Sequence, residues 1–267
     1  VTLLTEDFQA VPGAVPAALP SGRSTNQVTQ QDGSTGNAFK THNATSANTG
    51  GYWPVPNIPG NKFAGANDDA TPCDCAMDDV YIQSPTLDFS AATNIVVSFD
   101  IFHDQNFGGG DATLQASTDG GTTWNIVPIG VDATGANIDV FPIDQDFWQS
   151  LIVPVYDLSG QSSVTFRWQW TDNGSWASGF AVDNIVVGEL PATFDTWQKL
   201  CHPADLADVI ASLEEHIQLH TASFEAECRM CAKDRRWVWI YARGMVVSRD
   251  SDAKAVRMVG VHSDITA

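Results

Sequence analysis

Short strands separated by turn signals limit the possible folds of this chain more than any other feature of its sequence. Apolar residues occupy alternate positions from Ile95 to Ile101, and the same alternation returns between Val164 and Trp170. A period of two is the pattern of a strand with one buried and one exposed face. Glycine-rich breaks separate these runs, and none of them has the spacing of an amphipathic helix. The first two thirds of the chain are therefore predicted to be mainly β and to form a β-sandwich.

Within these strands, the segment Ser117–Trp124 reads STDGGTTW and predicts a tight hairpin. Glycine adopts positive φ without strain from a Cβ, so Asp-Gly-Gly between two strands is a strong turn signal. The segment also satisfies S-x-D-x-G-x-T-W, the Asp box known from sialidase propellers and secreted β domains, in which Asp and Ser hold the turn and Trp packs beneath it. We expect a structural role. Sialidase chemistry needs several arginines, and it is excluded because Arg167 is the only arginine between Arg23 and Arg229.

Charge is distributed unevenly along the chain. Residues 1–190 contain 4 Lys and Arg against 21 Asp and Glu, net −17, whereas residues 191–267 contain 9 against 11, net −2. We place a domain boundary at this step, giving domains 1–190 and 191–267. So acidic a domain repels phosphate backbones, and a nucleic-acid partner is not expected. No run approaches the roughly 20 apolar residues of a membrane span. The start at Val1, without a leader, predicts a mature chain whose signal peptide has been removed.

Aspartates crowd into one stretch, residues 68–79, with no lysine or arginine among them. They are Asp68, Asp69, Asp74, Asp78 and Asp79. Carboxylates this close repel one another unless a cation lies between them, and Ca²⁺ takes about six to eight such oxygen ligands. No EF-hand pattern is present. The stretch therefore indicates either a calcium site or a solvated acidic loop.

Two positions could present aromatic rings to a sugar. Tyr52-Trp53 lies between glycines and prolines, and Trp176 follows a turn. A pair such as Tyr52-Trp53 more often covers a core. By contrast, Trp168 and Trp170 share one face of an alternating strand and are predicted to point into the core.

Five motifs in order resemble a MAM-like jelly roll of the cleaved-adhesin or choice-of-anchor J type, over residues 3–190. They are Glu6-Asp7-Phe8, Asn67-Asp68-Asp69 followed by Cys73-Asp74-Cys75, Ile82–Ser90, the STDGGTTW turn and Gly179–Ile185. The resemblance implies a secreted or cell-surface bacterial module that binds carbohydrate or protein and holds a structural calcium. By position it implies Glu6, Asp7, Asp68, Asp69 and Asp183 as calcium ligands. It also favours a local disulfide between Cys73 and Cys75 over unpaired thiols or a soft-metal site.

The pattern changes after Pro191. Apolar residues at helical spacing from Leu206 to Ile217 predict one helix, followed by three antiparallel strands at Phe224–Met230, Arg236–Ala242 and Ala255–His262. The region resembles the second half of a PAS domain. The matching residues are Trp197, Cys201-His202-Pro203-x-Asp205, Phe224-x-Ala226-Glu227-x-Arg229 and the terminal Gly260-x3-Asp264-Ile265-Thr266. The fold class predicted for the whole chain is mainly β, a jelly-roll sandwich followed by a small α+β segment.

This segment departs from the family in two ways. The first half of a PAS domain is missing, which predicts an open sheet edge suited to self-association and a half-built pocket without a flavin or other organic cofactor. In addition, Asp234-Arg235 and Asp252-Ala253 place side chains in turns that favour positive φ, at a cost of about 1 kcal/mol each.

A zinc site is the alternative reading of His216-x3-His220 and Cys228-x2-Cys231. The histidines share a helix face, but positions three apart on a strand point to opposite faces, so both cysteines cannot reach one ion without a bend. We therefore expect structural roles for these residues. With five cysteines, two in one domain and three in the other, the chain is not a disulfide-framework protein.

Taken together, these patterns favour a secreted or cell-surface recognition module, stabilised by calcium, with a glycan or surface protein as partner. The alternative is a sensory protein in which the sandwich detects and the PAS-like segment relays. An enzyme is not expected, because the sequence shows no Ser/His/Asp set in an elbow, no phosphate loop and no distinctive carboxylate pair.

Overall fold

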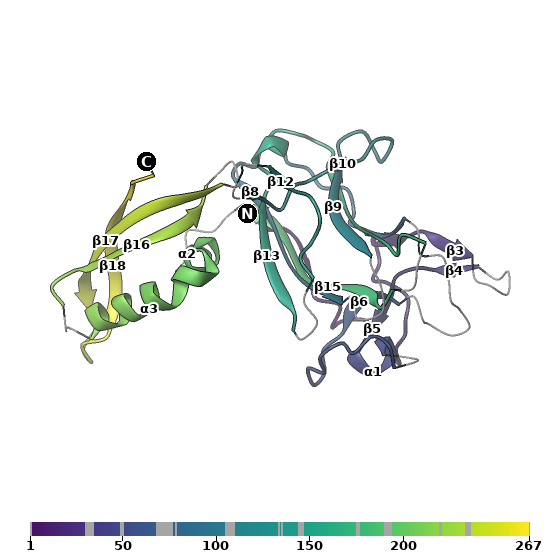
Figure 1. Cartoon of the computed structure of the whole chain (residues 1–267), viewed down its shortest axis with the longest axis horizontal. Coiled ribbons are helices and arrows are strands. Elements are labelled where there is room, and N and C mark those ends of the chain that lie inside the picture. Colours follow the sequence, from purple (N-terminus) through teal and green to yellow (C-terminus); the bar gives the residue numbers. More distant parts are fainter. Residues whose placement is uncertain are drawn as a thin grey trace. The chain divides into compact units, whose positions relative to one another are not determined.

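The computed structural model describes residues 2–29, 35–48, 51–67, 77, 79–104, 110–132, 134, 136–143, 147–174, 177–189, 194–218, 221–232 and 236–266. Two compact units make up the chain (Figure 1). The first unit comprises Val1–Asp132 and Ala136–Leu190, and the second comprises Pro191–Ala267 with Ala133–Gly135.

Two antiparallel sheets form the first unit. The six-stranded sheet has the order β13-β8-β15-β6-β5, with β1 also pairing with β15. Its strands are β1 (Thr2–Glu6), β5 (Lys40–His42), β6 (Phe63–Asn67), β8 (Ile95–Asp104), β13 (Gln149–Pro154) and β15 (Gly179–Glu189). The five-stranded sheet has the order β10-β9-β14-β7-β2. Its strands are β2 (Ser24–Thr25), β7 (Val80–Gln83), β9 (Asp111–Ser117), β10 (Asn125–Ile126) and β14 (Thr165–Thr171).

Smaller elements complete this unit. Two short pairs, β3 (Gln27–Thr29) with β4 (Thr35–Asn37) and β11 (Gly130–Val131) with β12 (Asn137–Ile138), lie outside the main sheets. The only helical turns in its described part are α1 (Ala44–Ala47) and the 3₁₀ turn η1 (Tyr156–Leu158).

The core of the first unit lies between the two sheets. Alternate residues of β8 and β14 are buried there, and the Phe99 and Trp168 rings meet edge to face with centroids 5.5 Å apart. Each such side chain contributes about 1.5–3 kcal/mol by leaving water. Trp170 is buried on the same face. The predictions of a jelly-roll sandwich and of inward-pointing Trp168 and Trp170 are confirmed.

The second unit is a three-stranded sheet with helices. Its elements are α2 (Phe194–Leu200), α3 (Pro203–Ile217), β16 (Phe224–Cys231), β17 (Trp237–Arg249) and β18 (Ala255–Asp264), and the strand order is β16-β17-β18. The three strands and the long helix confirm the prediction, while the short α2 was not predicted. No helix in the described part of the chain is long and apolar enough to cross a membrane.

Helix α3 is fixed at both its start and its buried face. His202 Nδ1 accepts the backbone N–H of Ala204 at 3.1 Å, and Pro203 occupies the first helical position, where its missing N–H costs nothing. Val209 and Leu213 pack in one cluster with Phe224 of β16. This packing joins the helix to one face of the sheet.

The two edges of this sheet differ. On β16, the Asp205 carboxylate accepts the Arg229 backbone N–H at 2.8 Å and binds the Arg229 guanidinium at 2.6 Å. On β18, no other strand among the described residues pairs with the side away from β17. The expected open edge is therefore present at β18. Ala253 has a φ of +61°, as its turn predicted, whereas Asp234-Arg235 lies outside the described residues.

Candidate functional site

The outer face of the five-stranded sheet carries polar and aromatic side chains in register. Arg167 on β14 lies opposite Gln115 on β9 and Gln83 on β7. One step along, Gln169 lies opposite Thr113 and Tyr81. Since Phe166, Trp168 and Trp170 fill the core, their alternating neighbours must point outward. We call this set the outer face: Tyr81, Gln83, Thr113, Gln115, Trp124, Arg167 and Gln169.

Hydrogen bonds connect the centre of the outer face. Arg167 Nε–H donates to Gln115 Oε1 at 2.8 Å, and its Nη2 donates to Gln169 Oε1 at 3.2 Å. Gln115 Nε2 also donates to Gln169 Oε1, and Gln169 Nε2 donates to Asp79 Oδ1. Each long side chain is therefore held in one orientation before any ligand arrives, which lowers the entropy cost of binding.

Two aromatic rings flank this network. The guanidinium carbon of Arg167 lies 4.3 Å from the centroid of the Trp124 ring and 5.2 Å from that of Tyr81. Both distances are those of cation–π contacts. Tyr81 and Trp124 are each partly exposed. The face thus offers aromatic surface next to planar hydrogen-bonding groups.

The turn Ser117–Trp124 holds Trp124 in place. Asp119 accepts the backbone N–H groups of Thr122 and Thr123 at 3.0 and 2.9 Å and the Ser117 hydroxyl at 2.8 Å. These donors, led by Thr123, lower the pKa of Asp119 to about 2. Trp124 Nε1–H closes the turn by donating to Gly121 O at 3.1 Å. The structural role expected for Asp and Ser is present, but Trp124 also lies against Arg167.

The aromatic residues predicted from the sequence fare differently. Trp53 is 0% exposed and packs against Phe63 and Phe102, so its ring belongs to a core and cannot stack on a sugar. Its neighbour Tyr52 is 45% exposed and remains a candidate. Trp176 lies outside the described residues.

Several predicted calcium ligands are not described. Asp68, Asp69, Cys73 and Cys75 lie outside the described residues, together with most of the acidic stretch. Glu6 forms an ion pair with Arg23 at 3.0 Å and accepts the Phe8 backbone N–H at 2.8 Å. The charge of Glu6 is therefore already balanced without a metal ion.

Asp183 differs from Glu6, because it is 1% exposed and lies near the carboxylates of Asp100 and Asp7. It accepts Asn61 Nδ2 at 3.0 Å and the Asn184 backbone N–H at 2.7 Å, beside a bulge in β15 where Asn184 has a φ of +50°. Burial, with added repulsion from Asp100 and Asp7, raises the pKa of Asp183 to about 7. A buried carboxyl group with carboxylate neighbours suits a hard cation such as Ca²⁺.

The fit to calcium is nevertheless partial. Within the described ranges, no group of three or more His, Cys, Asp and Glu side chains could hold a metal ion. Asp183 and Asp7 could supply two of the oxygens, and the rest of a calcium site would have to come from other groups.

The zinc alternative finds no support in the second unit. His216 Nδ1 lies 3.0 Å from Thr221 O, and its Nε2 accepts the Val246 backbone N–H at 3.0 Å. Both ring nitrogens are therefore engaged in structural bonds. Cys228 is buried in the core and Cys231 is partly exposed, while His220 lies outside the described residues.

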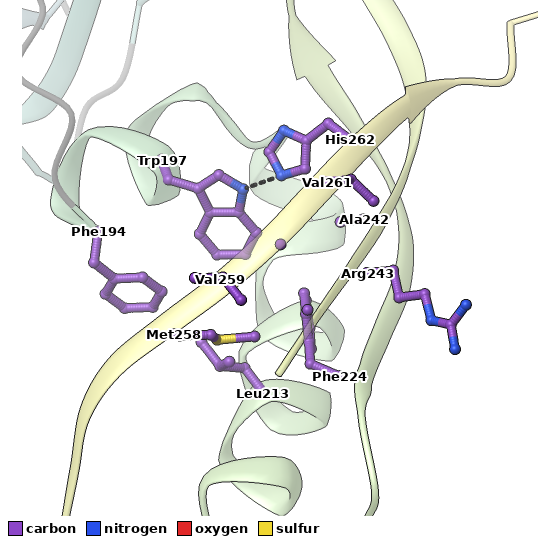
Figure 2. A pocket seen from close by; sticks show the side chains of 12 residues that line it. Phe194, Trp197, Leu213, Phe224, Ala242, Arg243, Met258, Val259, Val261 and His262 are labelled. Atoms are coloured by element: carbon purple, nitrogen blue, oxygen red, sulfur yellow. Dashed lines mark hydrogen bonds between the residues drawn. The ribbon is translucent and has the colours of Figure 1, made fainter. Parts of the chain in front are cut away.

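A cavity of about 440 Å³ lies between α2, α3 and the β17–β18 side of the sheet in the second unit. Figure 2 shows its apolar walls, formed by Phe194, Trp197 and Met258 among others, with Arg243 at one side. Trp197 Nε1–H donates to His262 Nε2 at 3.2 Å across it. Gly244 and Gly260 line it where a Cβ would collide with Met258 or with backbone.

Comparison with known proteins gives one family match and several similar solved structures. The PAS fold family matches residues 184–262. No curated protein matches the chain. Among solved structures, it is similar to the K1 cleaved adhesin domain of Lys-gingipain from Porphyromonas gingivalis W83, at 16% identity and a TM-score of 0.44, covering 71% of this chain and 99% of that one. The chain joins a jelly-roll sandwich to a PAS-like segment.

Two further solved structures have comparable TM-scores. The CBM22-1 xylan-binding domain from Paenibacillus barcinonensis Xyn10C has 9% identity and a TM-score of 0.37, covering 72% of this chain and 97% of that one. A cyclase from Fischerella sp. TAU has 16% identity and a TM-score of 0.45, covering 72% and 99%. At TM-scores below 0.5, these similarities do not decide a function.

The outer face was missed by sequence reasoning. Its residues lie at the polar positions of strands whose apolar positions were recognised, but which strand pairs with which, and in what register, is not written in any local pattern. The usable signal was the outward pair Arg167-x-Gln169 of β14 together with the STDGGTTW turn.

Proposed function

We propose that the first unit is a non-enzymatic recognition module that binds carbohydrate at its outer face. The observation that carries this proposal is the arrangement around Arg167, with two amide side chains hydrogen-bonded to it or to each other and two aromatic rings against it. Sugar rings present apolar C–H faces and hydroxyl groups together. An aromatic surface beside fixed donors and acceptors matches both.

The histidines of this unit give no support to acid–base catalysis. Its two histidines, His42 and His103, are both buried, and burial is the main cause that lowers the pKa of each to about 4. Neither is therefore exposed to a substrate as a general acid or base. On the outer face, Arg167 and its glutamines are engaged with one another.

Calcium and an extracellular location belong to the same proposal. Asp183 and Asp7 would hold Ca²⁺, which would neutralise charge and stiffen the bulge of β15. The motif resemblance and the acidity of residues 1–190 favour a module exported to the cell surface or beyond, with a glycan or a glycosylated surface protein as partner.

A glycan array probed with the intact chain tests the binding proposal. We expect binding that Trp124→Ala and Arg167→Gln reduce at least tenfold, while Tyr52→Ala leaves it within twofold. If Tyr52→Ala alone abolished binding, the glycan site would lie at Tyr52 and not at the outer face. An array with no bound glycan would overturn the proposal, provided that circular dichroism shows a folded chain.

The cavity of the second unit favours a second candidate function, a sensory protein. A space of about 440 Å³ walled by aromatic side chains can hold a small apolar molecule. Native mass spectrometry of the purified chain would test this reading. A retained small molecule that Met258→Trp displaces would support it, and a chain of unmodified mass that takes up no ligand from a library would oppose it.

A further inference from the structure

We infer that the glycan bound at the outer face is uncharged, and that Arg167 acts there as a hydrogen-bond donor and not as a counter-ion. This inference rests on the proposed function and adds the chemical class of its ligand. Three observations carry it: the supply of cations in the first unit, the carboxylates next to the face, and the contacts that already surround Arg167.

Cations are scarce near this site. Residues 1–190 contain four Lys and Arg: Arg23, Lys40, Lys62 and Arg167. Arg23 is paired with Glu6, Lys62 Nζ donates to the Val11 carbonyl, and Lys40 lies on β5 in the other sheet. Arg167 is therefore the single cation on the outer face. Sites that recognise acidic sugars or phosphates normally need several converging cations.

Carboxylates border the same face. Asp79 accepts a hydrogen bond from Gln169, and Asp111 accepts Asn173 Nδ2 at 3.2 Å beside Thr171 of β14. Both aspartates are exposed. An acidic sugar would bring its own carboxylate close to them, in a unit whose net charge is already −17. A neutral sugar would instead donate hydroxyl protons to the same oxygens.

The surroundings of Arg167 fit a donor role. Its guanidinium has five N–H donors, of which the two bonds to Gln115 and Gln169 use two. The Trp124 and Tyr81 rings lie against its cationic carbon. The remaining donors lie beside amide groups that both donate and accept, and hydroxyl groups, which also do both, are the complementary ligand.

The test compares pairs of oligosaccharides that share a backbone and differ in charge, such as fully methyl-esterified and de-esterified oligogalacturonides, after an array has identified bound backbones. With the intact chain in calorimetry, we expect each neutral member to bind at least tenfold more tightly than its acidic partner. Affinity for the neutral member should change less than twofold between 50 and 500 mM NaCl. A preference for acidic members, or a steep loss of affinity with salt, would overturn the inference and leave the proposed function standing. No binding of either class would instead overturn the proposed function.

Variants separate charge from donor geometry. Arg167→Lys keeps the charge and loses the planar donor fork, so we expect it to lose at least tenfold in affinity, as Arg167→Gln does. Retained affinity in Arg167→Lys would show that charge alone matters and would refute the donor role. Asp79→Asn should raise affinity for the acidic members at least threefold, and an unchanged ratio would contradict the part assigned to that carboxylate. Lys40→Gln, which removes a cation from the other sheet, is the control and should change neither class by more than twofold.

Discussion

The centroid of the Trp124 indole ring lies 4.3 Å from the guanidinium carbon of Arg167, although Trp124 lies in a turn, Arg167 lies on β14, and the two residues are 43 positions apart. Trp124 is held by a turn that Asp119 organises through backbone and hydroxyl donors. The geometry of the outer face therefore depends on Asp119, which is not part of that face.

Replacement of Asp119 should disturb the face without touching it. We expect Asp119→Ala to lower the melting temperature and to weaken glycan binding about tenfold, because the turn that positions Trp124 loses its hydrogen-bond acceptors. Thr118→Ala, at an exposed residue of the same turn, is the matched control. Unchanged binding in Asp119→Ala would separate the turn from the site.

The low pKa of Asp119 also fixes the direction of a pH effect. The folded pKa of about 2 is below the ordinary value of 3.8, so the stability from this group is complete above pH 3.8 and is lost as the pH falls toward 2. An NMR titration of the Asp119 carboxyl group measures this directly. A midpoint near 4 would show that the turn does not hold the carboxylate.

Asp183 should show the opposite dependence. Its folded pKa of about 7 is above the ordinary value of 3.8. Without calcium, the stability contributed by this group is therefore complete below pH 3.8 and is lost as the pH rises through about 7. Asp183→Asn should flatten this slope and, in chelator, stabilise the chain at pH 7.5 by on the order of 2 kcal/mol.

Melting temperatures with and without calcium test whether Asp183 is a metal ligand. If Asp183 binds Ca²⁺, millimolar calcium should raise the melting temperature of the unmodified chain and leave Asp183→Asn unchanged. Glu6→Gln is the comparison, since it breaks the pair with Arg23 and should destabilise both with and without calcium. Equal melting curves of the unmodified chain in calcium and in chelator would remove the metal from the proposal.

Ala253 offers a stabilising substitution. Its φ of +61° strains a residue with a Cβ, so Ala253→Gly should raise the free energy of unfolding of the second unit by about 1 kcal/mol. Its backbone N–H bond to Asp250 O, 3.0 Å long, does not depend on the side chain. Ala255→Gly, in the adjacent strand β18, should have the opposite sign. Urea denaturation compares the two.

The His216 ring connects helix α3 to Thr221 and to Val246 of β17. Its replacement by Ala leaves the Val246 N–H and the Thr221 carbonyl without their partner, and we expect a loss of about 2–3 kcal/mol in stability. Glu215→Ala, exposed on the same helix, should change stability by less than about 0.5 kcal/mol. A zinc chelator should have no effect on the unmodified chain, and destabilisation by it would reinstate the metal.

The sequence predicted what depends on local pattern. Period-two alternation was enough to turn Trp168 and Trp170 into the core, and helical spacing located α3. It did not predict the contact of Arg167 with Gln115, because these residues are 52 positions apart and meet only through strand pairing. For Trp53 the sequence left both a sugar platform and a core position open, for a related reason: glycine and proline around it indicate a turn, but not that Gly65 and Gly179 leave room for its ring. Helix α2 is too short to show a period.

The open edge of β18 should cause self-association when the protein is concentrated. Almost every residue of that strand is exposed, including Val256, Val259 and Val261, and its backbone can accept another strand. Sedimentation velocity should therefore reveal oligomers that grow with protein concentration and vanish when Val261→Lys places a charge on this edge strand. High salt should favour them, since it screens the repulsion between the acidic sandwiches that keeps the molecules apart.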